Sequence, residues 1–428
     1  MFSLLRHRPR RRLVRILKVT QAYYPFQERG GPAIKVRSIA RALAELGNEV
    51  TVLTADLGFG PQGIATAKVV RAPEGWRTDR DGVEVIYFRT RCHYRNLTVN
   101  PGVLGFCRRR LRGFDIVHIY GLYDTLGPLV GHYCRKFGVP YFVEPLGMTR
   151  PIDRGFLLKR IWRVLGRDYL FEASKWIATS ELERKDLRAA GVPSEKVLLR
   201  FNGIDREEFR KLPPFGAFRK HLGITGDEPL ILFLGRLIPR KGADLLIEAL
   251  PQIGGDKITL VIAGPEGESG YLDVLRNKAH RLGIDRRVIF PGPLYEELQK
   301  AAFVDATVFA LPSRYENFGN TAAEAIACGT PVVVSDRCGI APLVNQRAGL
   351  VTSYDSHAVA GTLKELLNTP TLYQRLKAGC AQVAEEISWE GLVRGMQDSY
   401  EKTVDDFLQR RSPVPSPSAG RDGPHQIS

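Results

Sequence analysis

Strand-like and helix-like segments alternate along almost the whole chain, and this order restricts the possible folds more than any other feature. A β-branched run at 13–20 is followed by a loop and then by apolar residues at helical spacing in 33–47. Further strands are expected at 49–55, 83–89, 115–120, 140–145, 175–180 and 196–201, and then at 229–237, 258–266, 287–294, 306–313 and 331–336. Strands that alternate with helices predict parallel sheets covered on both faces.

A segment rich in Pro, Gly and charged residues, 204–228, interrupts this pattern. The chain of 428 residues is also too long for one ordinary domain. We therefore expect an α/β protein of two doubly wound, Rossmann-like domains that face each other across a cleft. The expected parts are an N-terminal domain at 1–203 with a basic tail at 1–13, a C-terminal domain at 204–388, a helix at 389–411 that packs back on the N-terminal domain, and a disordered tail at 412–428.

The net charge of +16 fits nucleic acid, anionic lipid or phosphorylated substrates as partners, and charge does not choose among them. We find no nucleic-acid reader motif and no basic patch interleaved with aromatic residues, so nucleic acid is not expected as a partner. No apolar run approaches the roughly 18 residues of a membrane span. The six cysteines form no C-x-x-C pair, which is typical of reduced cytosolic thiols.

The stretch RYENFGNTAAEAIACGTPVVVSD at 314–336 places Glu316 and Glu324 on either side of a predicted helix start. Asn320 is expected to cap this helix, and small residues surround Glu324. The free N–H groups near the helix start can bind an anion. The stretch therefore combines acceptors for hydroxyl groups with donors for phosphate, as a sugar nucleotide requires. The alternative is a pair of solvated glutamates.

Two further loops follow strands at the edge where ligands bind in such sheets. Gly30 and Gly31 precede the first helix, so the backbone there can approach a phosphate or a sugar closely. Arg236 and Lys241 in FLGRLIPRKG follow a later apolar strand, and two fixed cations at that edge suit a diphosphate. A helix-entry turn and solvated surface cations are the respective alternatives.

Two ionisable residues lie near the ends of expected strands in the first half. His118 in DIVHIYG could be a core residue or part of a site. Glu144 in PYFVEPLGM could be a general base, a ligand of the acceptor substrate or a structural hydrogen-bond acceptor.

Two patterns suggest other chemistry but have simpler interpretations. GFGPQG at 58–63 matches the dinucleotide fingerprint, yet it follows the second strand, contains Pro61 and opens no helix, so a loop is favoured. Asp79 and Asp81 resemble a pair of metal ligands, but Asp81 and Gly82 before a strand favour a turn.

Together these segments resemble glycosyltransferase family 4, which has the two-domain GT-B fold. The resemblance covers roughly residues 14–405 and is most specific in GRLIPRKG, in LPSRYENFGNTAAEAIACGTPVVVSD and in YYPFQERGGP. It implies that the N-terminal domain lies on the acceptor side and that the C-terminal domain binds the nucleotide sugar. In the C-terminal domain, Arg236 and Lys241 would bind the donor diphosphate and Glu324 the donor ribose. Glu316 would hold the donor sugar, with phosphate bound by the backbone from Phe318 to Thr321 and by Gly31. The candidate catalytic residues are Glu316, Arg236, Lys241, His118 and Glu144, and the candidate donor-binding residues are Gly31, Arg236, Lys241, Glu316, Phe318, Gly319, Asn320, Thr321 and Glu324.

The resemblance implies a metal-independent enzyme without a cofactor that moves a hexose from a UDP- or GDP-sugar with retention of configuration. The acceptor would be a glycan or a lipid-linked sugar in polysaccharide or glycolipid biosynthesis. A phosphorylase or sugar-phosphate synthase on the same fold is the near alternative, and a basic nucleic-acid-binding protein is the alternative from another class. Many family members have a histidine where this chain has Glu144, which leaves the acceptor side open.

Two basic segments suggest where the protein works. Residues 1–18 contain seven Lys and Arg residues beside Phe2, Leu4 and Leu5. Residues 155–171 combine Arg and Lys with Trp162 at spacings that suit an amphipathic helix. We therefore expect a cytoplasmic protein that attaches peripherally to the inner face of the plasma membrane through anionic lipid. The alternative is that the Leu and Trp residues of 155–171 belong to the core and that the basic N-terminus is a flexible tail.

Overall fold

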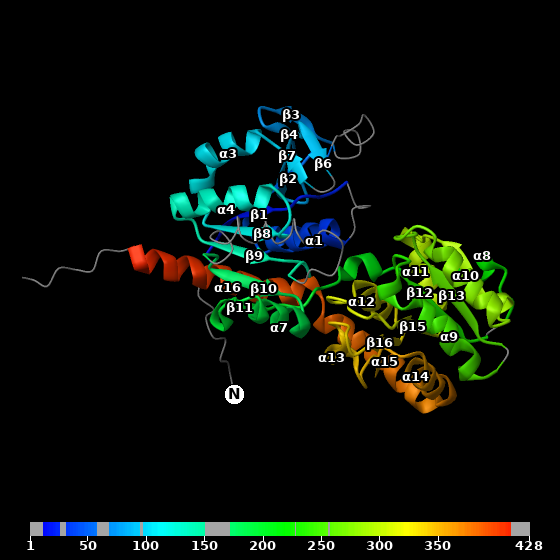
Figure 1. Cartoon of the computed structure of the whole chain (residues 1–428). Helices are drawn as coiled ribbons and strands as arrows, with labels where there is room; N and C mark the ends of the chain where they lie inside the picture. The colour runs from blue at the N-terminus through cyan, green and yellow to red at the C-terminus, as the bar shows by residue number, and fades with distance from the viewer. Residues whose placement is uncertain are drawn as a thin grey trace, which may run out of the picture.

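The computed structural model describes residues 12–25, 31–57, 68–94, 97–149, 172–226, 228–255 and 257–411. Two sheets, one mostly and one entirely of parallel strands, are each covered by helices and form two domains that lie side by side (Figure 1). The two doubly wound domains expected from the sequence are therefore confirmed.

The N-terminal domain is built on a nine-stranded sheet with the order β11-β10-β9-β8-β1-β2-β5-β4-β3. Its strands are β1 (Arg15–Val19), β2 (Glu49–Ala55), β3 (Val70–Ala72), β4 (Gly75–Arg80), β5 (Val83–Phe88), β8 (Ile116–Tyr120), β9 (Tyr141–Glu144), β10 (Lys175–Ala178) and β11 (Val197–Leu199). Central strand β1 pairs in parallel with β2 and β8, so that Leu17 lies opposite both Thr51 and Val117. The central strands are almost fully buried, which explains why most of their residues are apolar.

One edge of this sheet departs from the expectation of parallel strands. β3 and β4 pair antiparallel, and β4 pairs antiparallel with β5. The sequence did not predict them, because β4 is polar and only Thr78 in it is buried. Asp81 and Gly82 join β4 to β5 with φ of +56° and +71°, so the predicted turn is confirmed. Residues 58–63 lie outside the described part of the chain.

Helices cover both faces of the N-terminal sheet. The helices are α1 (Gly31–Glu45), α3 (Gly102–Arg110), α4 (Leu126–Phe137) and α7 (Glu181–Ala189). A small antiparallel hairpin, β6 (Cys92–Tyr94) with β7 (Leu97–Val99), lies outside the main sheet. The α7 helix starts where Ser180 Oγ accepts a hydrogen bond from the backbone N–H of Glu183, which is a typical N-cap.

The C-terminal domain has a six-stranded parallel sheet with the order β14-β13-β12-β15-β16-β17. The strands are β12 (Leu230–Leu234), β13 (Thr259–Ala263), β14 (Val288–Gly292), β15 (Val308–Leu311), β16 (Val332–Ser335) and β17 (Gly349–Thr352). The helices are α8 (Ala217–Leu222), α9 (Ala243–Ile253), α10 (Tyr271–Arg281), α11 (Glu296–Asp305), α12 (Asn320–Ala327), α13 (Ala341–Val344), α14 (Ser356–Asn368) and α15 (Pro370–Glu386). A strand at β17 was not expected from the sequence.

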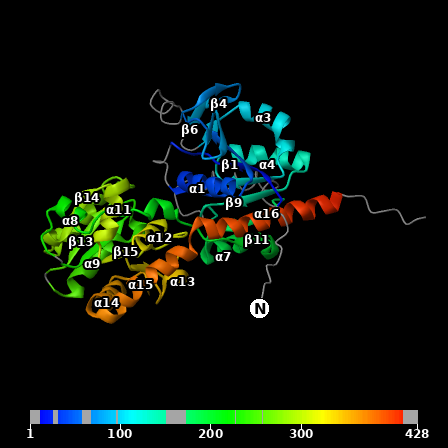
Figure 2. The same cartoon turned by 180° about the vertical axis from the view of Figure 1, so that it is seen from behind.

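The last helix, α16 (Trp389–Arg411), leaves the C-terminal domain and packs on the N-terminal one (Figures 1 and 2). Its apolar residues Trp389, Val393, Met396, Tyr400 and Val404 belong to the same buried cluster as residues of α1 and of the N-terminal sheet. The chain passes from the N-terminal to the C-terminal domain near Ile204 and returns near Ser388. These two segments lie side by side, because the backbone of Ile204 pairs with that of Ser388. The domain bounds expected from the sequence stay a prediction.

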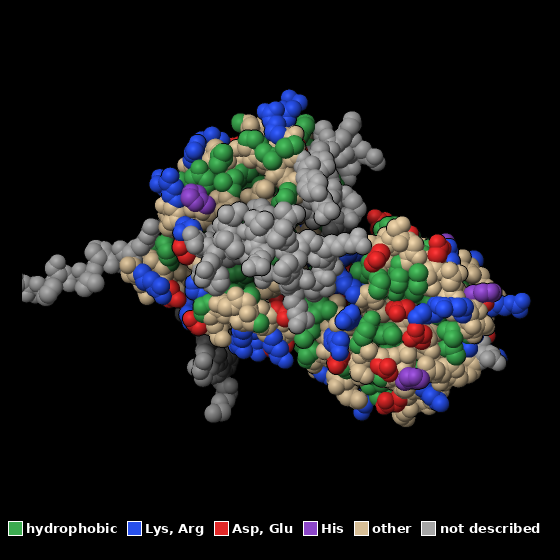
Figure 3. All heavy atoms as spheres, in the orientation of Figure 1, with side chains coloured by type: hydrophobic (Ala, Val, Ile, Leu, Met, Phe, Trp, Pro, Cys, Tyr) green, Lys and Arg blue, Asp and Glu red, His purple; other side chains and the backbone are tan. Residues whose placement is uncertain are grey.

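Within the described residues, no helix combines the length and the apolar character that crossing a membrane requires. Lys and Arg side chains appear on both domains of the face seen in Figure 3, and Asp and Glu lie among them on the C-terminal domain. All six cysteines are free, and only Cys92 is exposed.

Candidate functional site

The loop that joins β15 to α12 lies between the two domains, and its successive side chains point in different directions. The Tyr315 O–H donates to Asp186 Oδ2 of α7 at 2.8 Å. Asn317 Nδ2 donates to Thr179 Oγ1 of the N-terminal domain at 2.8 Å. Between them, Glu316 forms an ion pair with Lys241 of its own domain. The contacts to the N-terminal domain therefore fix the direction of the Glu316 side chain.

The ion pair between Lys241 and Glu316 joins two of the predicted site residues. The two side chains are 15% and 17% exposed. The backbone N–H of Glu316 donates to the Arg337 carbonyl at 3.0 Å, and the Glu316 carbonyl accepts from Gly339 at 2.9 Å. A lysine ammonium has three donors, so Lys241 can hold Glu316 and still contact a phosphate.

Helix α12 begins directly after this pair. Gly319 is the N-cap, with φ of +105°, and a Cβ there would lie 2.8 Å from Cys338 Sγ. The prediction that Asn320 caps the helix is therefore wrong by one residue. Asn320 is instead the first helical residue, and its Oδ1 accepts a hydrogen bond at 3.0 Å from Asn202 of the N-terminal domain. Phe318 is buried, Thr321 is half-buried, and the first N–H groups of α12 lack acceptors within the helix.

Glu324 is half-buried one turn further along α12. Its Oε2 accepts a hydrogen bond from Gln299 of α11 at 2.8 Å. Burial, together with the nearby Glu208 carboxylate, raises the pKa of Glu324 to about 7. Glu324 lines a cavity of about 70 Å³ between the domains, which Lys35, Asn202 and Asn320 also line. The structure thus places Glu324 at the domain boundary with a carboxyl group that titrates near neutrality.

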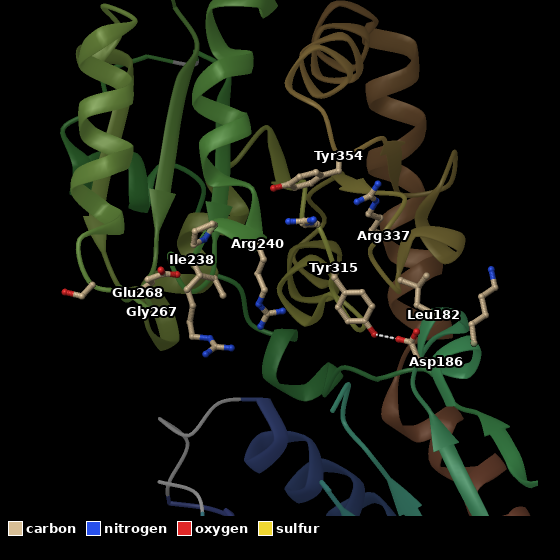
Figure 4. Close-up of a pocket in the computed structure, with 14 residues that line it drawn as sticks. Leu182, Asp186, Ile238, Arg240, Gly267, Glu268, Tyr315, Arg337 and Tyr354 are labelled. Carbon is tan, nitrogen blue, oxygen red and sulfur yellow. Dashed lines mark hydrogen bonds between the residues drawn. The ribbon is translucent and has the colours of Figure 1, made fainter. Parts of the chain in front are cut away.

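Arg236 lies in the wall of a much larger cavity, about 1340 Å³, between the C-terminal sheet and α7. The loop after β12 carries both Arg236 and Lys241, but only Lys241 reaches Glu316. Arg236 lies next to Gly267, because a Cβ atom built on Gly267 would be 3.4 Å from the Cβ of Arg236. Arg236 is therefore at the Gly267 end of the cavity. Figure 4 shows Glu268 and Gly267 on one side of this cavity and Leu182 and Asp186 on the other.

His118 and Glu144 lie in a fully buried polar cluster beneath the domain boundary. Glu144 pairs with Lys35 and, at 2.7 Å, with Arg200. His118 Nε2 is 3.4 Å from Glu144 Oε2, and His118 Nδ1 is 2.5 Å from the hydroxyl of Tyr400 in α16. Both predicted residues are therefore brought together, but neither lines one of the cavities described above.

Burial and charge set the protonation of this cluster. Burial favours the neutral form of Glu144, but the Arg200 and Lys35 cations outweigh it and hold the pKa of Glu144 well below its usual value. Burial lowers the pKa of His118 to about 3, so its imidazole is neutral near pH 7. Burial also lowers the pKa of Lys35 to about 8, although the Glu144 charge opposes this shift.

Sequence reasoning missed Lys35, Arg200, Asn202 and Tyr400. The sequence could have identified Lys35, because it shares one helical face with the buried residues Ile39 and Ala42. A lysine on a buried helix face needs a partner, and Glu144 is that partner. Lys35 also donates to Asn202 Oδ1 at 2.5 Å, which connects the cluster to the Glu324 cavity.

Gly31 is the first residue of α1. The loop before it, 26–30, is not described. Among the described residues, no group of three or more His, Cys, Asp or Glu side chains could hold a metal ion.

Family models match both halves of the chain. The model described as "Glycosyl transferases group 1" matches residues 215–382, and the model described as "Glycosyl transferase 4-like domain" matches residues 30–203. A D-inositol 3-phosphate glycosyltransferase of Frankia alni is 32% identical over 304 residues, which cover 67% of this chain and 74% of that protein. The D-inositol 3-phosphate glycosyltransferase of Xylanimonas cellulosilytica is 29% identical over 390 residues, which cover 87% and 91% of the two chains.

Solved structures share the fold over most of this chain. A sucrose-phosphate synthase from Thermosynechococcus elongatus superposes with a TM-score of 0.70 at 22% identity and covers 92% of this chain and 100% of its own. The Anabaena protein Alr3699/HepE in complex with UDP and glucose superposes with a TM-score of 0.71 at 19% identity, covering 91% and 100%. At these identities the likeness concerns the fold, and the expected arrangement of two Rossmann-like domains is confirmed.

Proposed function

This chain belongs to glycosyltransferase family 4, with the GT-B fold, and on that basis we propose that it moves a hexose from a UDP- or GDP-sugar to a glycan or lipid-linked acceptor. The transfer retains the anomeric configuration and uses no metal ion. The observation that carries this proposal is the Lys241–Glu316 pair beside the start of α12, with Glu324 one turn further along the same helix.

In this proposal, different residues bind different parts of the donor. Glu324 accepts hydroxyl hydrogen bonds from the ribose, and Glu316 accepts them from the donor sugar. Lys241, Arg236 and the N–H groups at the start of α12 stabilise the negative charge that develops on the leaving diphosphate. Fixed donors of this kind stabilise a transition state without reorganising during the reaction.

The names of the relatives support a second candidate for the acceptor. The names of these relatives, D-inositol 3-phosphate glycosyltransferases, contain a phosphorylated polyol, inositol 3-phosphate. A phosphorylated sugar or polyol therefore stands beside the glycan or lipid-linked acceptor. We further propose a role in polysaccharide or glycolipid biosynthesis, in the cytoplasm at the inner face of the plasma membrane. The segment 155–171, on which this location partly rests, lies outside the described residues.

A hydrolysis screen of UDP-, GDP- and ADP-sugars with the purified protein tests the donor. We expect turnover with one nucleotide class and no loss of rate when EDTA is added. The double variant Arg236→Ala and Lys241→Ala should lose turnover, because the leaving diphosphate then lacks both side-chain cations. The matched control, Lys257→Ala with Arg286→Ala, removes the same charge from exposed positions. Near-normal turnover by the first double variant, or a strict metal requirement, would contradict the proposal.

A further inference from the structure

The wide cavity between the domains is strongly basic. Among the described residues that line it, two are carboxylates, Asp186 and Glu268, and the Tyr315 hydroxyl already donates to Asp186. The cations that line it are Lys185, Arg236, Arg240, Arg314 and Arg337. The cavity thus carries a clear excess of positive charge, which attracts an anionic ligand.

Most of the cavity cations form no ion pair within the described part of the chain. Lys185, Arg240 and Arg314 have none there, and Arg337 has a long one, 4.0 Å, to the neighbouring Asp336. Lys185, Arg314 and Arg337 are exposed, so their charges are accessible to a ligand. Arg240 Nε is buried and has no hydrogen-bond acceptor among the residues that the structure describes. A buried donor without an acceptor costs free energy, so a ligand that supplies an oxygen atom would be favoured there.

The backbone holds two of these cations near each other. The N–H of Arg314 donates to the carbonyl of Arg240 at 2.8 Å, which ties the loop after β15 to the loop after β12. The guanidinium of Arg337 lies 5.8 Å from the centre of the Tyr354 ring in the next loop of the sheet. Four loops therefore line one space: three carry the cations Arg240, Arg314 and Arg337, and the fourth carries the ring of Tyr354. Planar guanidinium groups bind phosphate and carboxylate through paired hydrogen bonds.

This basic region is separate from most of the proposed donor ligands. Lys241 and Glu316 pair with each other and do not line the cavity, and Glu324 lines the smaller one. Arg236 is the shared residue, at the Gly267 end. In Figure 4, Arg240, Tyr315, Arg337 and Tyr354 lie between that end and the α7 end.

We propose that this cavity binds an anionic saccharide as the acceptor, one that carries phosphate or carboxylate groups, with Arg240, Arg314 and Arg337 as its ligands. The inference rests on the proposed function and specifies its acceptor class. The volume of about 1340 Å³ exceeds the roughly 300–1,000 Å³ of ordinary ligand pockets, so more than one sugar ring fits. Tyr354 offers an aromatic face beside the cations for an apolar face of the sugar.

The position of the cavity also suits an acceptor. Arg314 and Tyr315 directly precede Glu316, and the Arg337 carbonyl accepts from the Glu316 N–H at 3.0 Å. The residue proposed to hold the donor sugar thus shares its loop with the residues proposed to hold the acceptor. An acceptor bound here has its hydroxyl groups next to that loop.

Calorimetric titration with three oligosaccharides of one length tests the proposal. The probes are maltotetraose, a tetramer of galacturonic acid, and maltotetraose phosphate. The full chain is first saturated with UDP or GDP, whichever nucleotide the hydrolysis screen identifies. We expect at least one charged probe to bind while the neutral one does not. The galacturonate and phosphate probes distinguish the two sources of negative charge.

The variant Arg314→Gln with Arg337→Gln should bind the charged probe at least about tenfold more weakly, because two charge-assisted contacts are lost. Lys185→Gln, on the opposite wall, should weaken it in the same direction. The control Arg108→Gln with Arg286→Gln removes the same charge from exposed positions and should change the affinity less than about twofold. Melting temperatures verify that each variant is folded.

Three results would overturn the proposal: charged and neutral probes that bind alike, a control variant that loses as much affinity as the cavity variant, or a charged probe that displaces the nucleotide. The third would assign the cations to the donor diphosphate instead. Absence of any nucleotide-sugar turnover is a separate result, because it contradicts the proposed function itself.

Discussion

At the residue scale, the protonation of Glu324 is linked to its proposed contact with ribose. Its pKa is raised to about 7, so the carboxylate form dominates only above that pH. Glu324→Gln should weaken nucleotide binding at pH 8.5 by about 10- to 100-fold, since a hydrogen bond to a charged group contributes about 1.5–3 kcal/mol. At pH 5.5 wild type and variant should bind almost alike, because both side chains are then neutral.

Calorimetry with UDP and GDP at both pH values checks this prediction. The nucleotide phosphate also changes its protonation between these pH values, but this change affects binding to wild type and to the variant equally. The comparison of the two proteins therefore isolates the effect of Glu324. A melting curve should show a folded variant. An equal loss at both pH values, or no loss at pH 8.5, would contradict the assignment of Glu324 to the ribose.

Among the described residues, Glu144 forms ion pairs with two buried cations, Lys35 and Arg200. Replacement by Gln leaves both cations buried without this partner, and we expect a loss of about 3–5 kcal/mol in the free energy of unfolding. The folded-state pKa of Glu144 lies below its value of about 4.3 in an unfolded chain. Its contribution to stability is therefore present above that pH and is lost as the pH falls.

Urea denaturation at pH 7 and pH 3 measures this effect. The difference between wild type and Glu144→Gln should be large at pH 7 and clearly smaller at pH 3, because Glu144 is then protonated in the unfolded chain but still ionised in the folded one. A variant that is fully stable but inactive would instead favour the catalytic role expected from the sequence.

At the scale of the element, two glycines at the ends of α12 form a natural comparison. Gly319 and Gly329 both have positive φ, +105° and +81°, so alanine is strained at either position. Only at Gly319 would the added Cβ also clash, at 2.8 Å from Cys338 Sγ. We expect Gly319→Ala to lower the free energy of unfolding by more than the roughly 1 kcal/mol expected for Gly329→Ala.

Nucleotide affinity separates the two variants further, because only Gly319 lies beside the proposed phosphate site. Gly319→Ala should bind the donor nucleotide more weakly, and Gly329→Ala should bind it as wild type does. Equal behaviour of the two variants in both measurements would show that the turn at Gly319 has no special role.

The elements also show what a sequence can predict. β2 lies at the predicted residues 49–55, because its Val and Thr residues are β-branched and favour a strand. The polar edge strand β4 has no such signal, since its hydrogen bonds to β5 rather than its side chains define it. In the site, motifs in the sequence identified both Lys241 and Glu316 as site residues, and the structure pairs them. The sequence could not predict the residues around Glu144, because Lys35, Arg200 and Tyr400 are far apart in sequence and come together only in the fold.

At the scale of the whole molecule, α16 and the first residue of α12 both connect the two domains. Tyr400 of α16 reaches His118 in the N-terminal sheet, and Asn320 of α12 accepts from Asn202. Lys35 contacts both Glu144 and Asn202, so the buried cluster is connected to the cavity that Glu324 lines. A change in the relative position of the domains would therefore alter the surroundings of Glu324 directly.

The net charge of +16 gives the last prediction, which concerns attachment to membranes. Each near-surface cation contributes about 1 kcal/mol at an anionic membrane, so a few of the Lys and Arg residues in 1–18 suffice. We expect the protein to sediment with vesicles that contain phosphatidylserine at low salt and to leave them at high salt. Replacement of Arg8, Arg10 and Arg11 by Gln should weaken this binding, whereas the cavity variant Arg314→Gln with Arg337→Gln should bind as wild type does. If the wild-type protein stays in the supernatant with anionic vesicles at low salt, the attachment is absent and the acceptor is not reached through the membrane surface.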